Sequence, residues 1–199
     1  MPTPPEIILA STSPYRRALL QRLGLTVRCL APAYDEEAAR PGLVHLPFEA
    51  RALHLAAGKA AAVARLHPEA LVIGGDQIAS VDGEALHKPG TAVRAEAQLA
   101  LLSGRIHSLH TAVVVRHGAS GRQAEAVDVH ALQMRVLSPE AIARYVARDA
   151  PLDCAGSYRV ESLGIALFER VQGEDFTAVV GLPLTRLVAL LQGFGVEVP

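Results

Sequence analysis

Cysteine is scarce in this chain of 199 residues, which contains only Cys29 and Cys154, far apart in the sequence. Small domains that depend on disulfides carry more cysteines, so we expect reduced, buried thiols, as in a cytosolic protein. Residues 1–6 lack the basic and apolar regions of a secretory signal peptide. Apolar runs as long as a membrane span are also missing. The expectation is a cytoplasmic protein without a membrane segment.

The sequence also lacks an excess of charge of either sign. It has 19 Lys and Arg against 20 Asp and Glu, for a formal net charge of -1. Without an overall basic field we expect no nucleic-acid partner, and any anionic ligand has to be held by a local site. Hydrophobic residues make up 50% and charged residues 20% of the chain, as in ordinary globular proteins.

Several common catalytic motifs are missing as well. The chain has no P-loop and no Gly-x-Gly-x-x-Gly after a predicted strand. It has no Gly-x-Ser-x-Gly elbow, and its 8 histidines show neither a His-Glu-x-x-His motif nor zinc-ligand spacing. These absences argue against P-loop, dinucleotide-binding, hydrolase-elbow and zinc chemistry.

A strand, a polar turn and a helix open the chain. Residues 7–10 are an apolar run typical of a buried strand, and Ser13 is a good N-cap for a helix over 14–23. Arg16 and Arg17 stand in the first helical turn, where cations are normally disfavoured. A bound phosphate would reverse that penalty, so the pattern favours a phosphate site. The alternative is two solvated surface arginines.

Two further charged positions need an explanation. A strand over 26–30 leads to a loop with three acids at 35–37, where Glu36 is a ligand candidate and solvated charge is the alternative. The range 48–66 predicts an Ala-rich helix, and Lys59 falls within its apolar face. Such a lysine either extends to solvent or meets a negative partner, a phosphate being the functional possibility.

Asp76 is the strongest catalytic candidate. It follows a predicted buried strand over 70–73 and the pair Gly74-Gly75, which lets the backbone bend or a ligand approach closely. A buried carboxylate at the end of a strand is costly without a metal ion or a basic side chain beside it. The alternative role is a structural turn cap.

The remaining pattern is consistent with an α/β protein that has a mixed sheet, because strands alternate with helices and then cluster. Turn residues at 81–84 predict a hairpin. The other expected elements are a helix over 91–102, hairpin strands over 106–116 and 122–136, a helix over 138–148, a short strand over 163–168, and a final helix after 181–183.

Segments along nearly the whole chain resemble the Maf family of nucleoside triphosphate pyrophosphatases. The matching segments are Leu9–Arg17, Asp35-Glu36, Lys59, Gly75-Asp76-Gln77, Lys88-Pro89, Leu102–Arg105 and Val180–Pro183. The resemblance implies one Maf/ITPase-like α/β domain over residues 1–199. Two lobes would surround a long mixed β-sheet with flanking helices, with the active site in the cleft. It also implies hydrolysis of nucleoside triphosphates to monophosphate and pyrophosphate with Mg²⁺ or Mn²⁺, often by a homodimer.

The resemblance also implies roles for individual residues. Asp76 would be the general base, a metal ligand or both, and Glu36 a metal ligand. The residues expected to hold phosphate oxygens are Ser11, Arg16, Lys59 and Lys88.

Three positions resemble the branch of the family that acts on 7-methyl-GTP. Tyr15, Gln77 and Glu161 stand where the branch acting on dTTP and UTP tends to have Arg, Thr and Gln. Two departures affect the expected substrate fit: His87 replaces the usual Gly before Lys-Pro, and His110 replaces a frequent aromatic residue.

The expected function is pyrophosphatase activity on 7-methyl-GTP, which would remove modified nucleotides from the pool. Two alternatives remain open: a dTTP/UTP pyrophosphatase, and a non-catalytic nucleotide-binding regulator of cell division. The presence of both Asp76 and Glu36 argues against the non-catalytic regulator, because a protein that only binds triphosphate needs cations more than acids.

Overall fold

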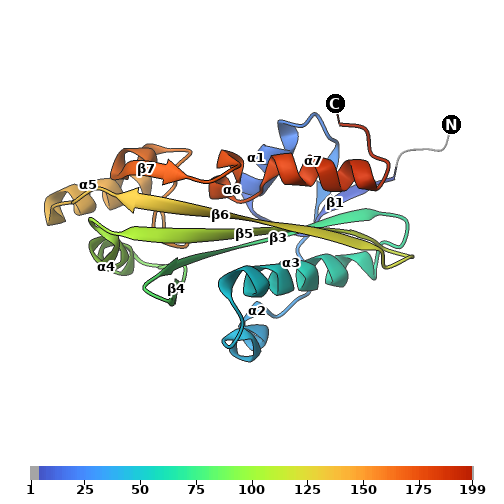
Figure 1. Cartoon of the computed structure of the whole chain (residues 1–199), viewed down its shortest axis with the longest axis horizontal. Helices are drawn as coiled ribbons and strands as arrows, with labels where there is room; N and C mark the ends of the chain where they lie inside the picture. The colour runs from blue at the N-terminus through green and yellow to red at the C-terminus, as the bar shows by residue number, and fades with distance from the viewer. Residues whose placement is uncertain (1–4, 199) are drawn as a thin grey trace. The chain divides into compact units, whose positions relative to one another are not determined.

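The computed structural model describes residues 5–198, which form a mixed α/β fold on one seven-stranded sheet (Figure 1). The strand order is β2-β1-β3-β5-β6-β7, with β4 paired to β3. The strands are β1 Ile7–Leu9, β2 Val27–Cys29, β3 Leu71–Val81, β4 Glu84–Leu86, β5 Ile106–His117, β6 Gln123–Met134 and β7 Phe168–Gln172. The predicted α/β class with a mixed sheet is confirmed.

The α-helices are α1 Pro14–Gln21, α2 Glu36–Ala39, α3 Phe48–Ala64, α4 Ala92–Leu102, α5 Pro139–Asp149, α6 Phe176–Val180 and α7 Leu184–Gly193. Two short 3₁₀ helices, η1 Arg40–Leu43 and η2 Leu163–Leu167, complete the described elements. Within the described residues, none of these helices has the length and apolarity to cross a membrane.

The chain divides into two compact units. The first contains the described residues up to Asp76, Thr111–Asp128 and the residues from Asp175 onward. The second contains Gln77–His110 and Val129–Glu174. Strands β3, β5 and β6 contribute residues to both units.

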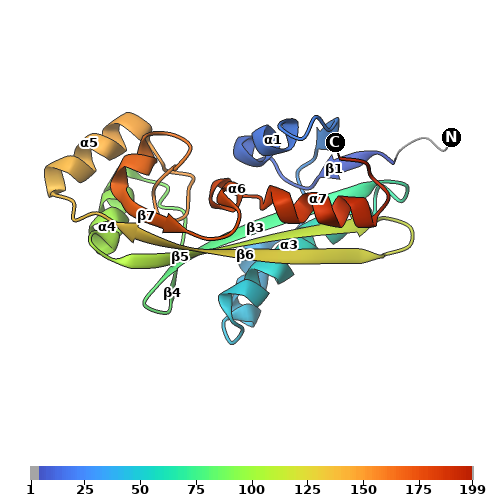
Figure 2. The same cartoon turned by 45° about the horizontal axis from the view of Figure 1, so that its top comes forward.

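In the first unit, β1 runs parallel to both β2 and β3. One face of these strands packs against α1 and α7, which lie side by side in both views (Figures 1 and 2). Leucines make most of this contact, including Leu9, Leu20 and Leu187, each of which is fully buried. Burial on both faces explains why β1 and the first residues of β3 are continuous apolar runs, whereas the partly exposed β2 alternates.

In the second unit, the predicted hairpin at 81–84 is confirmed, with β3 antiparallel to β4. Asp82 and Gly83 both adopt positive φ angles, which a tight hairpin turn requires. The core of this unit contains an aromatic cluster. The His107 and Tyr158 rings have centroids 5.4 Å apart, and Tyr158 and Phe168 lie 4.8 Å apart, edge to face.

Some sequence predictions are wrong in detail. The expected strand over 163–168 is the 3₁₀ helix η2, because Gly164 packs against the backbone of Arg159 and turns the chain. The acidic loop contains α2, whose N-cap Asp35 accepts from the Ala38 amide at 2.9 Å. Helix α6 was not predicted. The free Cys29 and Cys154 are partly exposed rather than buried.

His107 makes stability depend on pH. Burial lowers the pKa of its imidazole to about 4, whereas the pKa in the unfolded chain is near 6.5. The unfolded state therefore binds the proton first, and the free energy of unfolding falls as pH decreases from 6.5 to 4, by about 3 kcal/mol in total. Urea denaturation between pH 6.5 and 4 should show a free energy of unfolding that depends more steeply on pH in the wild-type protein than in His107→Asn. Equal slopes would contradict this assignment.

Candidate active site

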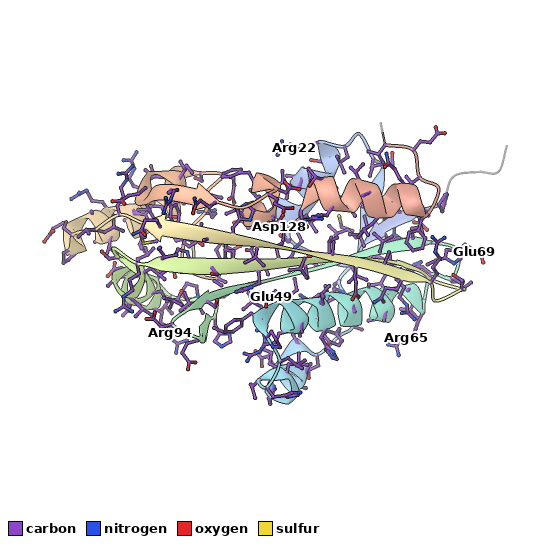
Figure 3. All side chains as sticks on the ribbon, viewed as in Figure 1. Arg22, Glu49, Arg65, Glu69, Arg94 and Asp128 are labelled. Carbon is purple, nitrogen blue, oxygen red and sulfur yellow. The ribbon has the colours of Figure 1, made fainter. Side chains whose placement is uncertain are left out.

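Lys59 joins two carboxylates in the first unit. Its Nζ donates to Asp76 Oδ1 at 2.7 Å and lies 3.0 Å from Glu36 Oε1. The Lys59 and Asp76 side chains are 7% and 6% exposed, and that of Glu36 is 35% exposed. Lys59 lies in the interior of α3, whose ends are marked by Glu49 and Arg65 in Figure 3. The solvent-extending alternative for Lys59 is therefore wrong.

Gly74 explains how α3 comes so close to β3. A Cβ atom at position 74 would lie only 2.2 Å from the carbonyl oxygen of Ala56. Ala52, Ala56 and Ala60 are fully buried, so α3 faces the strand with small side chains. The close approach predicted for the glycine pair is thus made by a helix, and it brings Lys59 to Asp76.

The sequence pattern placed Asp76 at the end of its strand, and this prediction is wrong. Asp76 lies inside β3, because the apolar run over 70–73 continues as a strand to Val81. One carboxylate oxygen, Oδ1, accepts from Lys59, while Oδ2 is buried and has no hydrogen-bond partner among residues 5–198. A buried acceptor without a donor is costly, and it marks a position that a ligand or water can satisfy.

Arg16 reaches this cluster from the first turn of α1. The N-cap Ser13 and Pro14 at the first helical position are confirmed. The Nε of Arg16 donates to the Gly181 carbonyl at 3.0 Å, and its Nη1 lies 3.5 Å from Ser11 Oγ. Gly75 leaves room for the guanidinium, since a Cβ there would lie 3.3 Å from Arg16 Nε.

The charge of Arg16 is balanced by the acidic residues. Burial lowers the pKa of its guanidinium, and the negative charges of Asp76 and Glu36 oppose that lowering. The surface alternative is wrong for Arg16 but holds for Arg17, which is exposed. Arg16, Ser11, Glu36, Lys59 and Asp76 are therefore neighbours within one unit.

Tyr34 belongs to the same neighbourhood and was missed in the sequence. Its ring packs over Gly58, where a Cβ atom would lie 2.3 Å from Tyr34 Cζ. Burial, then the charges of Glu36 and Asp76, raise the pKa of its phenol. A glycine inside a helix costs about 1 kcal/mol relative to alanine, and this was the signal for a close approach at position 58.

A divalent cation fits this site only together with a phosphate ligand. Among the described residues, no group of three His, Cys, Asp or Glu side chains could hold a metal alone. Mg²⁺ is usually held by one or two carboxylates, with substrate phosphates and water as the other ligands. Asp76 and Glu36 match that pattern, since Asp76 Oδ2 has no partner in the part of the chain that the structure describes.

Asp175 fixes the turn that carries the Gly181 carbonyl. Its Oδ1 accepts from the amide and hydroxyl of Thr177 at 2.9 and 2.5 Å. Its Oδ2 accepts from the amide and hydroxyl of Thr185 at 2.7 and 2.8 Å. Burial raises the pKa of the Asp175 carboxyl, but these hydrogen bonds outweigh it and leave the pKa below its ordinary value.

Asp175→Ala should lower the free energy of unfolding by at least about 2 kcal/mol, because bonds to a charged group are lost and buried donors are left unpaired. Urea denaturation at neutral pH measures this effect. The exposed Glu37→Ala is the control and should change little. Equal stability of the two variants would show that Asp175 does not hold α6 to α7.

Glu161 lies in a turn that is anchored on both sides within the second unit. The Arg159 amide donates to Tyr145 Oη at 3.0 Å, and Ser162 Oγ donates to Asp149 Oδ1 at 2.6 Å. The Ser162 amide closes the turn onto the Arg159 carbonyl at 3.2 Å. Glu161 is exposed, and loss of hydration is the largest influence on the pKa of its carboxyl, which it raises.

The other predicted specificity and phosphate residues are placed as follows. Tyr15 is half-buried next to Arg16 in α1, and Gln77 follows Asp76 in β3. Lys88 is exposed in the segment between β4 and α4. Gln77, Lys88 and Glu161 belong to the second unit, so their participation with Asp76 in one site stays a prediction.

The two histidine departures also have defined places. The His87 side chain is exposed, and its backbone carbonyl accepts from the side chain of Gln98. His110 is buried, with Nε2 3.0 Å from Ser80 Oγ.

Comparison with known proteins decides the family. Residues 6–194 match the family model described as Maf-like protein. This chain belongs to the Maf family. The resemblance carried by the short segments, from Leu9–Arg17 to Val180–Pro183, is thereby confirmed.

Relatives within the Maf family share nearly their full length with this chain. A protein of Xanthomonas axonopodis pv. citri (strain 306) is 48% identical over 195 residues, covering 98% of this chain and 100% of the relative. One of Bordetella avium (strain 197N) is 45% identical over 193 residues, covering 97% and 95%. Both are named 7-methyl-GTP pyrophosphatase. A solved structure of a HAM1 protein from Coxiella burnetii aligns with a TM-score of 0.44 and 18% identity, covering 65% of this chain and 72% of that one.

Proposed function

We propose that this Maf protein hydrolyses 7-methyl-GTP to 7-methyl-GMP and pyrophosphate, and so removes a modified nucleotide from the pool. The observation that carries the proposal is the buried Asp76 carboxylate beside Arg16, with one oxygen held by Lys59 and the other without a partner among residues 5–198. The names of relatives that match along nearly the full length support the choice of substrate. A homodimer and a cytoplasmic location are further proposals that rest on the resemblance.

The proposed reaction is attack of water on the α-phosphorus. A bond forms between the water oxygen and the α-phosphorus, the bond from that phosphorus to the α–β bridging oxygen breaks, and pyrophosphate leaves. Asp76 Oδ2 is the proposed acceptor of the proton from water, because it is free of other donors among the described residues. Ser11, Arg16, Lys59 and Lys88 are proposed to hold phosphate oxygens, which aligns the substrate and stabilises the charge that develops.

Glu36 and Asp76 would hold Mg²⁺ or Mn²⁺ together with the triphosphate. When bound, the ion would neutralise phosphate charge and acidify water. Lys59, which lies between the two carboxylates, keeps them close together.

Recognition of the base is assigned to Tyr15, Gln77 and Glu161. Methylation at N7 makes guanine cationic, and a cation over an aromatic face gains about 0.5–2 kcal/mol. Tyr15 offers such a face next to Arg16. The guanine edge has two adjacent donors, N1–H and N2–H₂, which one carboxylate accepts, and Glu161 is the proposed acceptor. Gln77 would bond the base or a ribose hydroxyl.

The proposed function is tested with a panel of 7-methyl-GTP, GTP, dTTP and UTP, each with Mg²⁺ and Mn²⁺. Pyrophosphate and orthophosphate are measured separately. We expect the highest kcat/KM for 7-methyl-GTP, with pyrophosphate as the product. A preference for dTTP or UTP would favour the other branch of the family, and tight binding without turnover would favour a nucleotide-binding regulator.

Exchanging the branch residues should change the substrate preference. Gln77→Thr with Glu161→Gln is expected to raise activity on dTTP and UTP relative to 7-methyl-GTP, because an amide pairs with a pyrimidine edge that presents both a donor and carbonyls. The ratio of kcat/KM values for UTP and 7-methyl-GTP measures this effect. Gln133→Leu serves as the control. An unchanged ratio in the double variant would show that Gln77 and Glu161 do not recognise the base.

A further inference from the structure

The side chain of Gln98 bridges two segments of the second unit. It lies in α4, half-buried. Its Nε2 donates to the His87 carbonyl at 2.7 Å, and its Oε1 accepts from Ser157 Oγ at 2.6 Å. His87 directly precedes Lys88, the proposed phosphate contact. Ser157 belongs to the segment that leads to Glu161, the proposed base contact.

A backbone bond reinforces this bridge. The Gly90 amide donates to the Leu152 carbonyl at 3.0 Å, which joins the same two segments on the other side of Lys88. The segment around Lys88 is thus held at His87 by a side chain and at Gly90 by the backbone. Lys88 itself is exposed and free to extend from this fixed support.

Ser157 combines an uncommon backbone conformation with a buried hydroxyl that is bonded to Gln98. Its φ angle is 63°, in the left-handed region that residues with a side chain rarely adopt. The residue is fully buried, so its hydroxyl needs a partner inside the protein, and Gln98 supplies one. The next residue, Tyr158, is held by His107, whose Nε2 lies 2.8 Å from its hydroxyl.

The fixed conformation extends from Ser157 to Glu161. Tyr158 is packed in the aromatic cluster, and the Arg159 amide is bonded to Tyr145 Oη. Few freely rotating residues remain between the bridge and the turn that carries Glu161. A shift at Ser157 would therefore displace Glu161, and a shift at His87 would displace Lys88.

We infer that Gln98 is a positioning residue that sets the spacing between the residue proposed to hold phosphate, Lys88, and the residue proposed to read the base, Glu161. This inference rests on the roles given to those two residues under the proposed function. Gln98 acts through these two residues, because its one side chain holds both of the segments that carry them.

Three variants separate the two arms of the bridge. Gln98→Glu keeps an acceptor for Ser157 but places a carboxylate oxygen against the His87 carbonyl, so it breaks the arm to Lys88. Ser157→Ala breaks the arm to Glu161 and leaves the bond to His87. Gln98→Leu breaks both arms. Gln133→Leu is the matched control, because the Gln133 amide also donates to backbone carbonyls of this unit, at Gly104 and Met134.

The arms should change different kinetic quantities. We expect Gln98→Glu to raise KM about fivefold to tenfold for 7-methyl-GTP and UTP alike, because every substrate carries the triphosphate. Ser157→Ala should lower the ratio of kcat/KM for 7-methyl-GTP over UTP by a similar factor, because only the base contact is displaced. Gln98→Leu should show both effects. If Gln98 had a purely structural role, KM and the ratio of kcat/KM values would change in the same way in all three variants.

Hydrogen exchange gives a readout that needs no activity. In Gln98→Leu, exchange should become faster in peptides covering residues 86–91 and 152–162, and it should stay unchanged there in the control. Unchanged exchange in both segments, or kinetics indistinguishable from those of Gln133→Leu, would overturn the inference. A wild-type protein inactive on 7-methyl-GTP would overturn the proposed function, whereas faster exchange in Gln98→Leu would still support the bridge.

Discussion

Asp76→Asn is expected to lower kcat for nucleotide hydrolysis by about 10²–10⁴-fold, the usual cost of losing a general base, while the fold is kept. The exchange is nearly isosteric, and an amide carbonyl at the position of Oδ1 can still accept from Lys59, which now donates at 2.7 Å. The second oxygen, unpartnered among the described residues, becomes an amide nitrogen that cannot take a proton. Steady-state kinetics with pyrophosphate detection measures the effect.

The control for this variant is Asp35→Asn. Asp35 caps α2 next to Glu36, and asparagine caps a helix equally well, so the change removes a nearby negative charge without altering the structure. Asp35→Asn should keep nearly full activity, and thermal unfolding should show both variants folded. Near-native kcat in Asp76→Asn would exclude Asp76 as the base.

Lys59→Met has the second large expected effect, on stability as well as on activity. Removing the lysine leaves the buried Asp76 carboxylate without its ion-pair partner, and breaking a buried pair in this way costs about 3–5 kcal/mol. The apolar surroundings of Lys59 in α3 alone would suggest the opposite, a gain from removing a buried cation. The ion pairs of Lys59 with Asp76 and Glu36 favour the first expectation, a loss of stability. Urea denaturation measures the stability, and kcat/KM should fall as well.

Lys88 provides a matched control, because Lys59 and Lys88 are the only lysines in the sequence. Lys88 is exposed, so Lys88→Met should leave the free energy of unfolding within about 0.5 kcal/mol of wild type, as usual for surface changes. It should raise KM for the triphosphate. If Lys59→Met were as stable as Lys88→Met, the ion pairs of Lys59 would contribute nothing to the folded state.

Local patterns predicted much of the fold. The N-cap Ser13, the hairpin at 81–84 and the long helix α3 follow from interactions between residues close in sequence, and all three are confirmed. The strand containing Asp76 was predicted too short, because its apolar run is interrupted by two glycines that the sheet tolerates. Their role depends on α3 and Arg16, which approach them only in the folded chain.

The candidate site was predictable as a set of residue types but not as a set of contacts. Lys59 could be recognised as unusual in an apolar stripe, yet its partners lie elsewhere in the sequence, and nothing local identifies them. The same holds for Gln98, whose bonds reach residues 11 and 59 positions away. Such residues look like ordinary polar positions of a helix until the fold is known.

The most direct test of the central claim is hydrolysis of 7-methyl-GTP in water enriched in ¹⁸O, with mass spectrometry of both products. Attack at the α-phosphorus predicts one ¹⁸O atom in 7-methyl-GMP and none in pyrophosphate. Asp76→Asn should form labelled 7-methyl-GMP far more slowly than the wild-type protein. Label in pyrophosphate, or release of labelled orthophosphate with 7-methyl-GDP, would contradict the account.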